Sequence, residues 1–210
     1  IVKAYEAVTQ YCGWAPIEAG KTMGLFPYGQ QNLKIPDIYT DYDGMSDWST
    51  TNRDLIVPTY PNGAVVNYGR FTELRNPPSL GVGDDLTKLQ SRRDMAYAIQ
   101  TESEQMVLDL IRKAVKMSGE KNVVLSGGYG LNCVANYWYL EQLKDEGINL
   151  FVEPVSNDAG TAIGAAYWHY QKVSKSTKVH PQIKDLYYGP KYEYDTEYIK
   201  DLASYYNATR

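Results

Sequence analysis

Apolar residues recur with the period of an α-helix over residues 91–117, the longest regular pattern in the chain. The stripe predicted to face the core consists of Met95, Ile99, Met106, Leu110 and Ala114, with Val107, Ile111 and Val115 beside it. Ser91 followed by Asp94 gives a start signal, and Gly119 gives a stop signal. We therefore predict a helix about 40 Å long, at 1.5 Å per residue, that crosses one face of a sheet.

Short apolar runs alternate with helical patterns after this helix. Strands are predicted over 122–126 and 149–153, and helices over 132–146 and 158–172. Strand–helix–strand units of this length form right-handed parallel crossovers, which indicates the α/β class. Because both strands are short apolar runs, we expect both faces of their sheet to be covered.

The remaining segments are less regular. Residues 1–13 have helical spacing, and residues 20–29, with glycines at both ends and a proline, predict a loop. Residues 30–85 are rich in Pro, Gly, Asn, Asp and Tyr, which predicts irregular structure with one hairpin around 55–71. A last helix is predicted over 195–206.

Charge and composition exclude several classes of protein. The 210 residues carry a net charge of −4, which argues against a nucleic-acid partner because phosphate binding needs clustered Lys and Arg. No apolar stretch approaches the ~20 residues of a membrane span. Cys12 and Cys133 lie in unrelated contexts, which predicts reduced thiols in a cytoplasmic protein. The chain lacks an initiator Met and opens in a helical pattern, so we expect a fragment of a longer protein.

Both strand-to-helix turns have unusual residues. Residues 126–132 read SGGYGLN, and residues 154–161 read PVSNDAGT. Parallel strands end at the same edge of a sheet, so we expect the two turns side by side, where open α/β sheets bind ligands. Glycine lets the backbone approach a ligand closely, and helix N-termini attract phosphate. Together the two turns predict a nucleotide site.

A structural reading of the turns is equally supported by the residues alone. A glycine pair after a strand also forms a plain tight turn, and Asn157 or Asp158 also fits as a helix cap. The first turn is not a P-loop, because no Gly-Lys-Ser/Thr follows, and its glycine spacing is not that of a Rossmann fingerprint.

Three ordered motifs resemble those of the NodU/CmcH-type O-carbamoyltransferases. They are GKTMGLFPYG at 20–29, LSGGYGLNCVANYWYL at 125–140 and PVSNDAGTAIGAA at 154–166. Their order and spacing agree with the family, with Phe26 in place of its usual alanine. The region 30–85 looks specific to this branch.

The resemblance implies a partial actin-like ATPase domain with the ribonuclease H-like fold, in which parallel strands are joined by crossover helices. Residues 1–190 would form the C-terminal half of this domain, with an irregular insertion at about 30–85. Residues 191–210 would be a linker helix toward a YrdC-like domain that this chain does not contain.

The resemblance also implies site residues. Gly127, Gly128, Asn132 and Gly160 match positions that bind the adenine nucleotide, where the glycines give the adenylate room and Asn132 offers a polar side chain.

Two charged residues match catalytic positions. Lys21, with Tyr28 from the same motif, would face the active site and meet a phosphate or carbamoyl oxygen, although the residue by itself fits a solvated surface lysine equally well. Asp158 matches an aspartate that ligates a metal, usually iron, in related enzymes.

Enzymes of this kind work in two steps. ATP, bound with Mg²⁺, reacts with carbamoyl phosphate to give carbamoyl-adenylate in the YrdC-like domain. A hydroxyl group of a small-molecule acceptor then attacks the carbamoyl carbon in the actin-like domain, and AMP leaves; a metal there would polarise the adenylate. Aromatic residues of the insertion are candidates to stack on a sugar ring of the acceptor, although packing of the insertion explains them equally well: Tyr39, Tyr42, Trp48, Tyr60 and Tyr68.

This chain departs from the family pattern by omission. The paired metal-binding histidines of the family have no counterpart, since only His169 and His180 are present and their separation fits no local ligand motif. We expect His169 to be packed or partly exposed, and the 210-residue chain alone to be inactive. Two alternatives stay open: a sugar kinase or ATPase with the actin-like fold, and a non-catalytic nucleotide-binding module.

Overall fold

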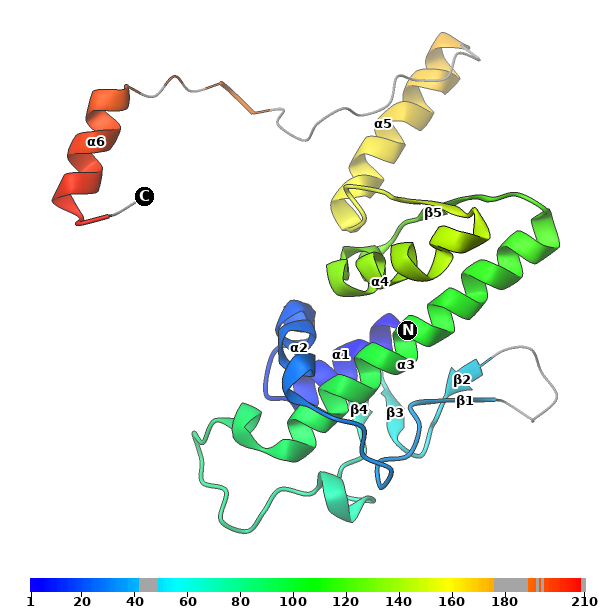
Figure 1. Cartoon of the computed structure of the whole chain (residues 1–210), viewed down its shortest axis with the longest axis vertical. Helices are drawn as coiled ribbons and strands as arrows, with labels where there is room; N and C mark the ends of the chain where they lie inside the picture. Colours follow the sequence, from blue (N-terminus) through cyan, green and yellow to red (C-terminus); the bar gives the residue numbers. More distant parts are fainter. Residues whose placement is uncertain (42–48, 176–188, 192, 194, 209–210) are drawn as a thin grey trace. The chain divides into compact units, whose positions relative to one another are not determined.

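The computed structural model describes residues 1–41, 49–175, 189–191, 193 and 195–208 (Figure 1). The chain divides into two compact units, Ile1–Ala165 and Ala166–Arg210, and each is described by itself. In the described residues, helices combine with one parallel and two antiparallel pairs of strands. The prediction of an α/β protein with a parallel strand pair is therefore confirmed.

The first unit is organised around the long helix α3 (Gln90–Ser118), about 44 Å long at 1.5 Å per residue. It ends at Gly119, whose φ of 75° is the left-handed conformation that glycine adopts at helix ends. The predicted start signal is wrong in its mechanism, because the N-cap is Leu89 and makes no side-chain hydrogen bond. Asp94 instead accepts hydrogen bonds from the Gln90 side chain (2.7 Å) and the Gln30 backbone N–H (3.1 Å).

A first core surrounds the N-terminal half of α3. Helix α1 (Val2–Tyr11) packs there against α3 and against strand β4 (Gly63–Val66). Fully buried side chains of this core come from α1, the region 30–85 and α3: Val8, Ile38, Leu55, Leu74, Met95 and Ile99.

The described residues of the region 30–85 form short strands and irregular segments, as predicted. Strands β1 (Tyr39–Asp41) and β2 (Ser49–Thr51) pair antiparallel, and β3 (Ile56–Thr59) forms the predicted hairpin with β4. Short 3₁₀ helices of the first unit lie at Pro16–Glu18, Phe26–Tyr28, Thr72–Leu74, Leu86–Lys88, Gly128–Leu131 and Lys144–Glu146.

A second core surrounds the C-terminal half of α3. Its buried residues lie on this helix and on α4 (Cys133–Leu143): Val107, Leu108, Ile111, Ala135, Tyr139 and Leu143. Strands β5 (Asn122–Leu125) and β6 (Asn149–Val152) pack against them through Val123, Leu125 and Leu150. The predicted stripe is confirmed at Val107 and Ile111, which are buried together with Leu108. It is wrong at Leu110, which is 45% exposed, and at Ala114, which is exposed, because the buried face is turned toward Val107 and Ile111.

The parallel sheet of β5 and β6 is covered on one face by this core. The expectation that both faces are covered is wrong in this structure. Val124 is 65% exposed and Phe151 is 45% exposed, whereas Val123 and Leu150 pack against the second core. Alternate residues of each strand therefore differ in burial, as in a sheet packed on one side.

The first motif is helical rather than a loop. Residues 20–29 fall in α2 (Ala19–Leu25) and the 3₁₀ helix that follows it. Burial of Thr22 and Leu25 stabilises α2 despite Gly20 and Gly24, since tertiary packing overrides the ~1 kcal/mol helix penalty of glycine.

The last two predicted helices are present. Helix α5 (Asp158–Ser174) crosses the boundary between the two units, and α6 (Thr196–Tyr205) is capped by Asp195, which accepts a hydrogen bond from the Glu197 backbone N–H (2.9 Å). Among the residues that the structure describes, no helix combines the length and the apolar character that a bilayer span requires. Cys12 and Cys133 are free thiols, as predicted.

Candidate functional site

The two strand-to-helix turns lie side by side, as predicted. Strands β5 and β6 are parallel neighbours, with Leu125 opposite Val152, so both chains leave the sheet at the same edge. A Cβ on Gly130 of the first turn would lie 3.0 Å from Cβ and Oγ of Ser156 in the second. Gly130 is therefore the contact that lets the two turns approach each other.

The glycine pair forms an open stretch of backbone. Gly127 has a φ of 98° and a ψ of 169°, a conformation that other residues rarely adopt. No atom lies within 4 Å of the position of a Cβ on Gly127 or Gly128. This backbone is accessible to a ligand, and a side chain on Gly128 would occupy the space that a ligand needs.

Asn132 follows the turn and is held by hydrogen bonds inside the protein. The residue is 8% exposed, and its Oδ1 accepts from the Ala135 backbone N–H (3.0 Å), which caps α4. Its amide also pairs with that of Gln100 on α3: Gln100 Nε2 donates to Oδ1 (3.1 Å), and Nδ2 donates to Gln100 Oε1 (2.9 Å).

Gln100 belongs to a buried polar cluster that our sequence analysis missed. The Tyr5 hydroxyl donates to Gln100 Oε1 (2.6 Å), and Gln100 Nε2 donates to Glu104 Oε1 (2.7 Å). Burial raises the pKa of the Glu104 carboxyl above its usual range. The signal in the sequence was three polar residues, Gln100, Ser103 and Glu104, at helical spacing inside an apolar pattern.

Tyr129 connects this cluster to the glycine turn. Its hydroxyl donates to Ser103 Oγ (2.8 Å), and its ring meets that of Tyr5 edge-on with centroids 6.3 Å apart. Burial raises the pKa of Tyr129, so the phenol stays protonated and acts as a donor. The turn is thus anchored to α1 and α3 as well as to its own strand.

A pocket of about 340 Å³ opens where α1, α2 and the glycine turn meet. Its lining residues are Val2, Tyr5, Glu6, Pro16, Ile17, Ala19, Gly20, Met23, Gly128, Tyr129, Leu131 and Asn132. The pocket joins Gly20 of the first motif to Gly128 and Asn132 of the second. We call it the glycine-turn pocket.

The other predicted residues of the first motif do not line this pocket. Lys21 Nζ lies 2.5 Å from Glu18 Oε1 and 6.0 Å from the centroid of the Trp14 ring. Tyr28 is 68% exposed. Their roles toward a phosphate or carbamoyl oxygen stay predictions.

In the second turn, Asn157 caps helix α5, whereas Gly160 allows close packing of the backbone. Asn157 Oδ1 accepts from the Ala159 backbone N–H (2.9 Å), which satisfies one free donor at the start of α5. The neighbouring Asp158 is exposed. Gly160 allows a close approach of the chain, because a Cβ there would lie 2.4 Å from the Val155 carbonyl oxygen.

Metal ligands do not gather around Asp158. Within the residues that the structure describes, no three His, Cys, Asp or Glu side chains form a group able to hold a metal ion. His169 is exposed on α5, and His180 lies outside the described residues. Metal ligation by Asp158 stays a prediction that needs ligands from elsewhere.

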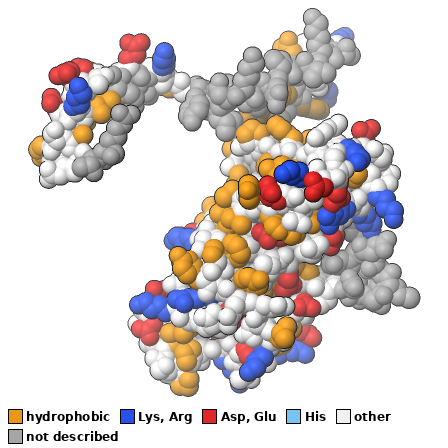
Figure 2. Space-filling view, in the orientation of Figure 1, with side chains coloured by type: hydrophobic (Ala, Val, Ile, Leu, Met, Phe, Trp, Pro, Cys, Tyr) orange, Lys and Arg blue, Asp and Glu red, His pale blue; other side chains and the backbone are white. Residues whose placement is uncertain are grey.

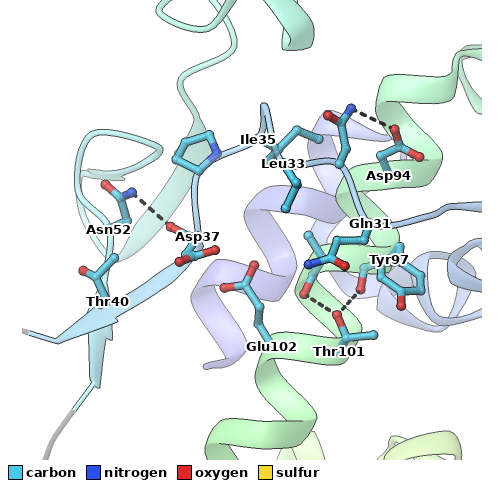
Figure 3. A pocket seen from close by; sticks show the side chains of 13 residues that line it. Gln31, Leu33, Ile35, Asp37, Thr40, Asn52, Asp94, Tyr97, Thr101 and Glu102 are labelled. Atoms are coloured by element: carbon cyan, nitrogen blue, oxygen red, sulfur yellow. Dashed lines mark hydrogen bonds between the residues drawn. The ribbon is translucent and has the colours of Figure 1, made fainter.

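A larger pocket, of about 660 Å³, lies between α3 and the segment that leads into β1 (Figure 3). Its lining is acidic, with Asp37, Asp94 and Glu102 and, among its described lining residues, no Lys or Arg. Burial is the main cause that raises the pKa of Glu102 to about 6, although its carboxylate accepts the Ile38 backbone N–H (2.7 Å). This lining does not suit an anionic nucleotide.

The aromatic residues proposed to stack on an acceptor do not converge. Tyr60 is 98% exposed, Tyr68 lies beside Tyr11 with ring centroids 6.2 Å apart, and the Tyr39 hydroxyl contacts the Ile1 carbonyl at 3.5 Å. None of these three lines either pocket. The other two candidates, Tyr42 and Trp48, lie outside the described residues.

Known proteins share extended similarity with this chain. It is 33% identical over 195 residues to the uncharacterized protein sll1178 of Synechocystis, which covers 90% of this chain and 30% of that protein. It is 27% identical over 205 residues to nodulation protein NolNO of Sinorhizobium fredii (96% and 27%) and 29% identical over 193 residues to nodulation protein NolO of Bradyrhizobium diazoefficiens (89% and 31%). The chain thus spans less than a third of the length of these relatives.

A family model covers most of the chain. Residues 1–167 match the model described as the carbamoyltransferase N-terminus. The match includes all three motifs and ends two residues beyond the first compact unit, which closes at Ala165. The chain belongs to the carbamoyltransferase N-terminus family.

Proposed function

We propose that this chain is the nucleotide-binding part of an ATP-dependent O-carbamoyltransferase with an actin-like domain. The observation that carries the proposal is the glycine-turn pocket. Gly20 and Gly128 come from motifs more than a hundred residues apart, yet both line it. Shared lining by two motifs of one family indicates a common ligand.

The chemistry of the pocket suits the nucleoside part of a nucleotide. Pro16, Ile17, Met23 and Leu131 supply apolar walls for a flat base. The hydroxyls of Tyr5 and Tyr129 donate to partners inside the protein. The other polar side chains of the lining are the Glu6 carboxylate, which also pairs with Lys3 (2.8 Å), and the amide of Asn132. A carboxylate can accept the hydrogen bonds of ribose hydroxyls.

The phosphate end of the ligand needs other groups. Among the described lining residues of the pocket there is no Lys or Arg. Free backbone at Gly127 and Gly128 is open to an approaching phosphate, and Lys21 follows Gly20 directly in sequence. Movement of Lys21 away from Glu18 would bring its charge toward such a group.

The proposed reaction uses carbamoyl-adenylate. Water first cleaves carbamoyl phosphate to carbamate and phosphate, and a carbamate oxygen then bonds to the α-phosphorus of ATP as pyrophosphate leaves. An acceptor hydroxyl oxygen bonds to the carbamoyl carbon, the bond from that carbon to the AMP phosphate oxygen breaks, and the hydroxyl proton is released. In this scheme the residues of the glycine-turn pocket hold the adenosine and orient the carbamoyl group. They do not themselves move a proton.

Iron, the metal implied by the family resemblance, does not fit the described residues alone. Asp158 is a single exposed carboxylate, and transition-metal sites need several protein ligands in a defined geometry. We therefore derive no step through a metal.

The test measures nucleotide products of the full-length protein. With ATP, Mg²⁺, labelled carbamoyl phosphate and a panel of hydroxyl acceptors, we expect AMP to form only when carbamoyl phosphate is present, and label to enter an acceptor. Formation of ADP with a sugar and without carbamoyl phosphate would identify a kinase instead. Absence of both products and of AMP binding would contradict any nucleotide role.

A further inference from the structure

We propose that Gln100 is a positioning residue for the glycine-turn pocket. It fixes the orientation of the Asn132 amide, so that the pocket presents a hydrogen-bond donor, and no acceptor, to its ligand at this point. The inference rests on the nucleotide function proposed above. It adds which residue pair determines the kind of ligand atom that the pocket accepts.

Gln100 is held in one amide orientation, because its nitrogen faces a hydrogen-bond acceptor and its oxygen faces a hydrogen-bond donor. Its side chain is fully buried, and each of its four hydrogen-bonding positions is used. The Glu104 carboxylate lies 2.7 Å from Nε2 and the Tyr5 hydroxyl lies 2.6 Å from Oε1. A flipped amide would set Gln100 Oε1 against the carboxylate, which costs more than a lost hydrogen bond because the groups are buried.

The orientation of Gln100 determines that of Asn132. Oδ1 of Asn132 faces two donors, Gln100 Nε2 (3.1 Å) and the Ala135 N–H (3.0 Å), which use both of its lone pairs. Nδ2 gives one hydrogen to Gln100 Oε1 (2.9 Å). One N–H of the Asn132 amide is therefore left for a ligand.

This arrangement selects the ligand atom that meets Asn132. Because Asn132 lines the pocket, a nucleoside must place an acceptor there, such as a ring nitrogen or a ribose oxygen. A ligand that places a donor at the same point would oppose the N–H, and an unpaired polar group in a buried site lowers affinity strongly.

The helix α3 has a second role under this proposal. A buried glutamine in an apolar stripe is costly unless it is fully paired, and two of the four bonds of Gln100 go to one pocket residue 32 positions away. Helix α3 thus holds Asn132 in the pocket lining through Gln100, and it also contributes buried residues to both hydrophobic cores.

The experiment compares AMP binding by calorimetry with thermal stability in the full-length protein. Gln100→Glu replaces the donor nitrogen by an oxygen, which opposes both the Glu104 carboxylate and Asn132 Oδ1 and so displaces the Asn132 amide from its position. We expect the AMP dissociation constant to rise at least tenfold, or ~1.4 kcal/mol. Gln105→Glu is the matched control. Gln105 is exposed on the same helix, where its side chain donates to Asp109 (3.0 Å). The AMP affinity of this variant should equal that of the wild type.

A second variant covers the case in which Gln100→Glu does not fold. Asn132→Asp keeps the acceptor for Ala135 and for Gln100 Nε2 but removes every N–H and sets its second oxygen against Gln100 Oε1. The unfolding midpoint should therefore fall, and the AMP affinity of the protein that stays folded should also fall at least tenfold. A merely structural cluster would lower the midpoint and leave the AMP affinity of the folded protein intact. Wild-type affinity in Asn132→Asp overturns this inference alone, whereas a wild-type protein that does not bind AMP overturns the proposed function with it.

Discussion

The side-chain amides of Gln100 and Asn132 form a reciprocal pair, with Nε2–Oδ1 and Nδ2–Oε1 distances of 3.1 and 2.9 Å. The pair joins α3 to the N-cap residue of α4. It connects the two parts of the first unit that Figure 1 shows along α3, the segment with α1 and the segment with α4. The position of the glycine turn relative to α1, and hence the shape of the pocket between them, depends on this buried contact.

Gly128→Val should weaken nucleotide binding without unfolding the protein. A Cβ at Gly128 meets no atom within 4 Å, so the fold has room for a branched side chain, but that side chain occupies the ligand's approach. We expect AMP affinity to fall at least tenfold, ~1.4 kcal/mol, as measured by calorimetry.

Gly69→Val is the control for this change, because a Cβ at Gly69 also meets open space but lies outside the pocket. Equal AMP affinity in Gly128→Val and Gly69→Val would show that the ligand does not approach this backbone. Gly127 is unsuitable for the test, since its positive φ would strain any other residue.

Gly160→Ala should destabilise the second turn. The new Cβ would lie 2.4 Å from the Val155 carbonyl oxygen, so the backbone must shift, and overpacking of this kind costs about 1–3 kcal/mol. Chemical denaturation measures the loss. Gly24→Ala, a helical site in open space, should instead gain up to about 1 kcal/mol; equal effects of the two variants would contradict the packing role of Gly160.

Local pattern explains which parts of this fold were predictable. The helical period of α3 and the alternation of β5, α4, β6 and α5 are local signals in the sequence. This alternation predicts parallel strands, and parallel neighbouring strands end at the same edge of the sheet, which places the two turns side by side. The first motif was misread, because its helix depends on the burial of Thr22 and Leu25, which no local pattern shows.

The site was predictable only where a motif marked it. Gly128 and Asn132 were identified, but Gln100, the internal partner of Asn132, was not. The helical spacing of Gln100, Ser103 and Glu104 marks a polar cluster, but it does not show that the cluster meets a residue 32 positions away. The exposed face of the β5–β6 sheet was also unexpected. The apolar composition of a strand shows that both of its faces tolerate burial. It does not show whether another element packs on each face.

Stability should depend on pH through Glu102. Burial is the largest cause that raises its pKa to about 6, above the ~4.3 expected in the unfolded chain. A raised carboxyl pKa contributes stability that is fully present below the unfolded value and is lost as pH rises through about 6. The urea midpoint should therefore fall between pH 4.5 and 7 by this contribution.

Glu102→Gln should remove that part of the pH dependence, because the amide oxygen can still accept the N–H groups of Ile38 and Tyr39 and carries no charge. Glu141→Gln, at an exposed position on α4, should keep the wild-type profile. An unchanged slope in Glu102→Gln would mean that Glu102 is solvated in solution.

Asp158 is the residue at which a metal role and a structural role predict different results. The cap of α5 is supplied by Asn157, so Asn157→Ala should cost ~1 kcal/mol of stability, whereas Asp158→Ala should leave the unfolding midpoint nearly unchanged. If Asp158 ligates a metal in the full-length enzyme, Asp158→Ala should abolish carbamoyl transfer and lower the metal content measured by elemental analysis.

The 210-residue chain alone should bind no stoichiometric iron or zinc, because its described residues bring no three ligands together. Full turnover with wild-type metal content in Asp158→Ala would exclude the metal role and leave Asp158 as an exposed residue at the start of a helix.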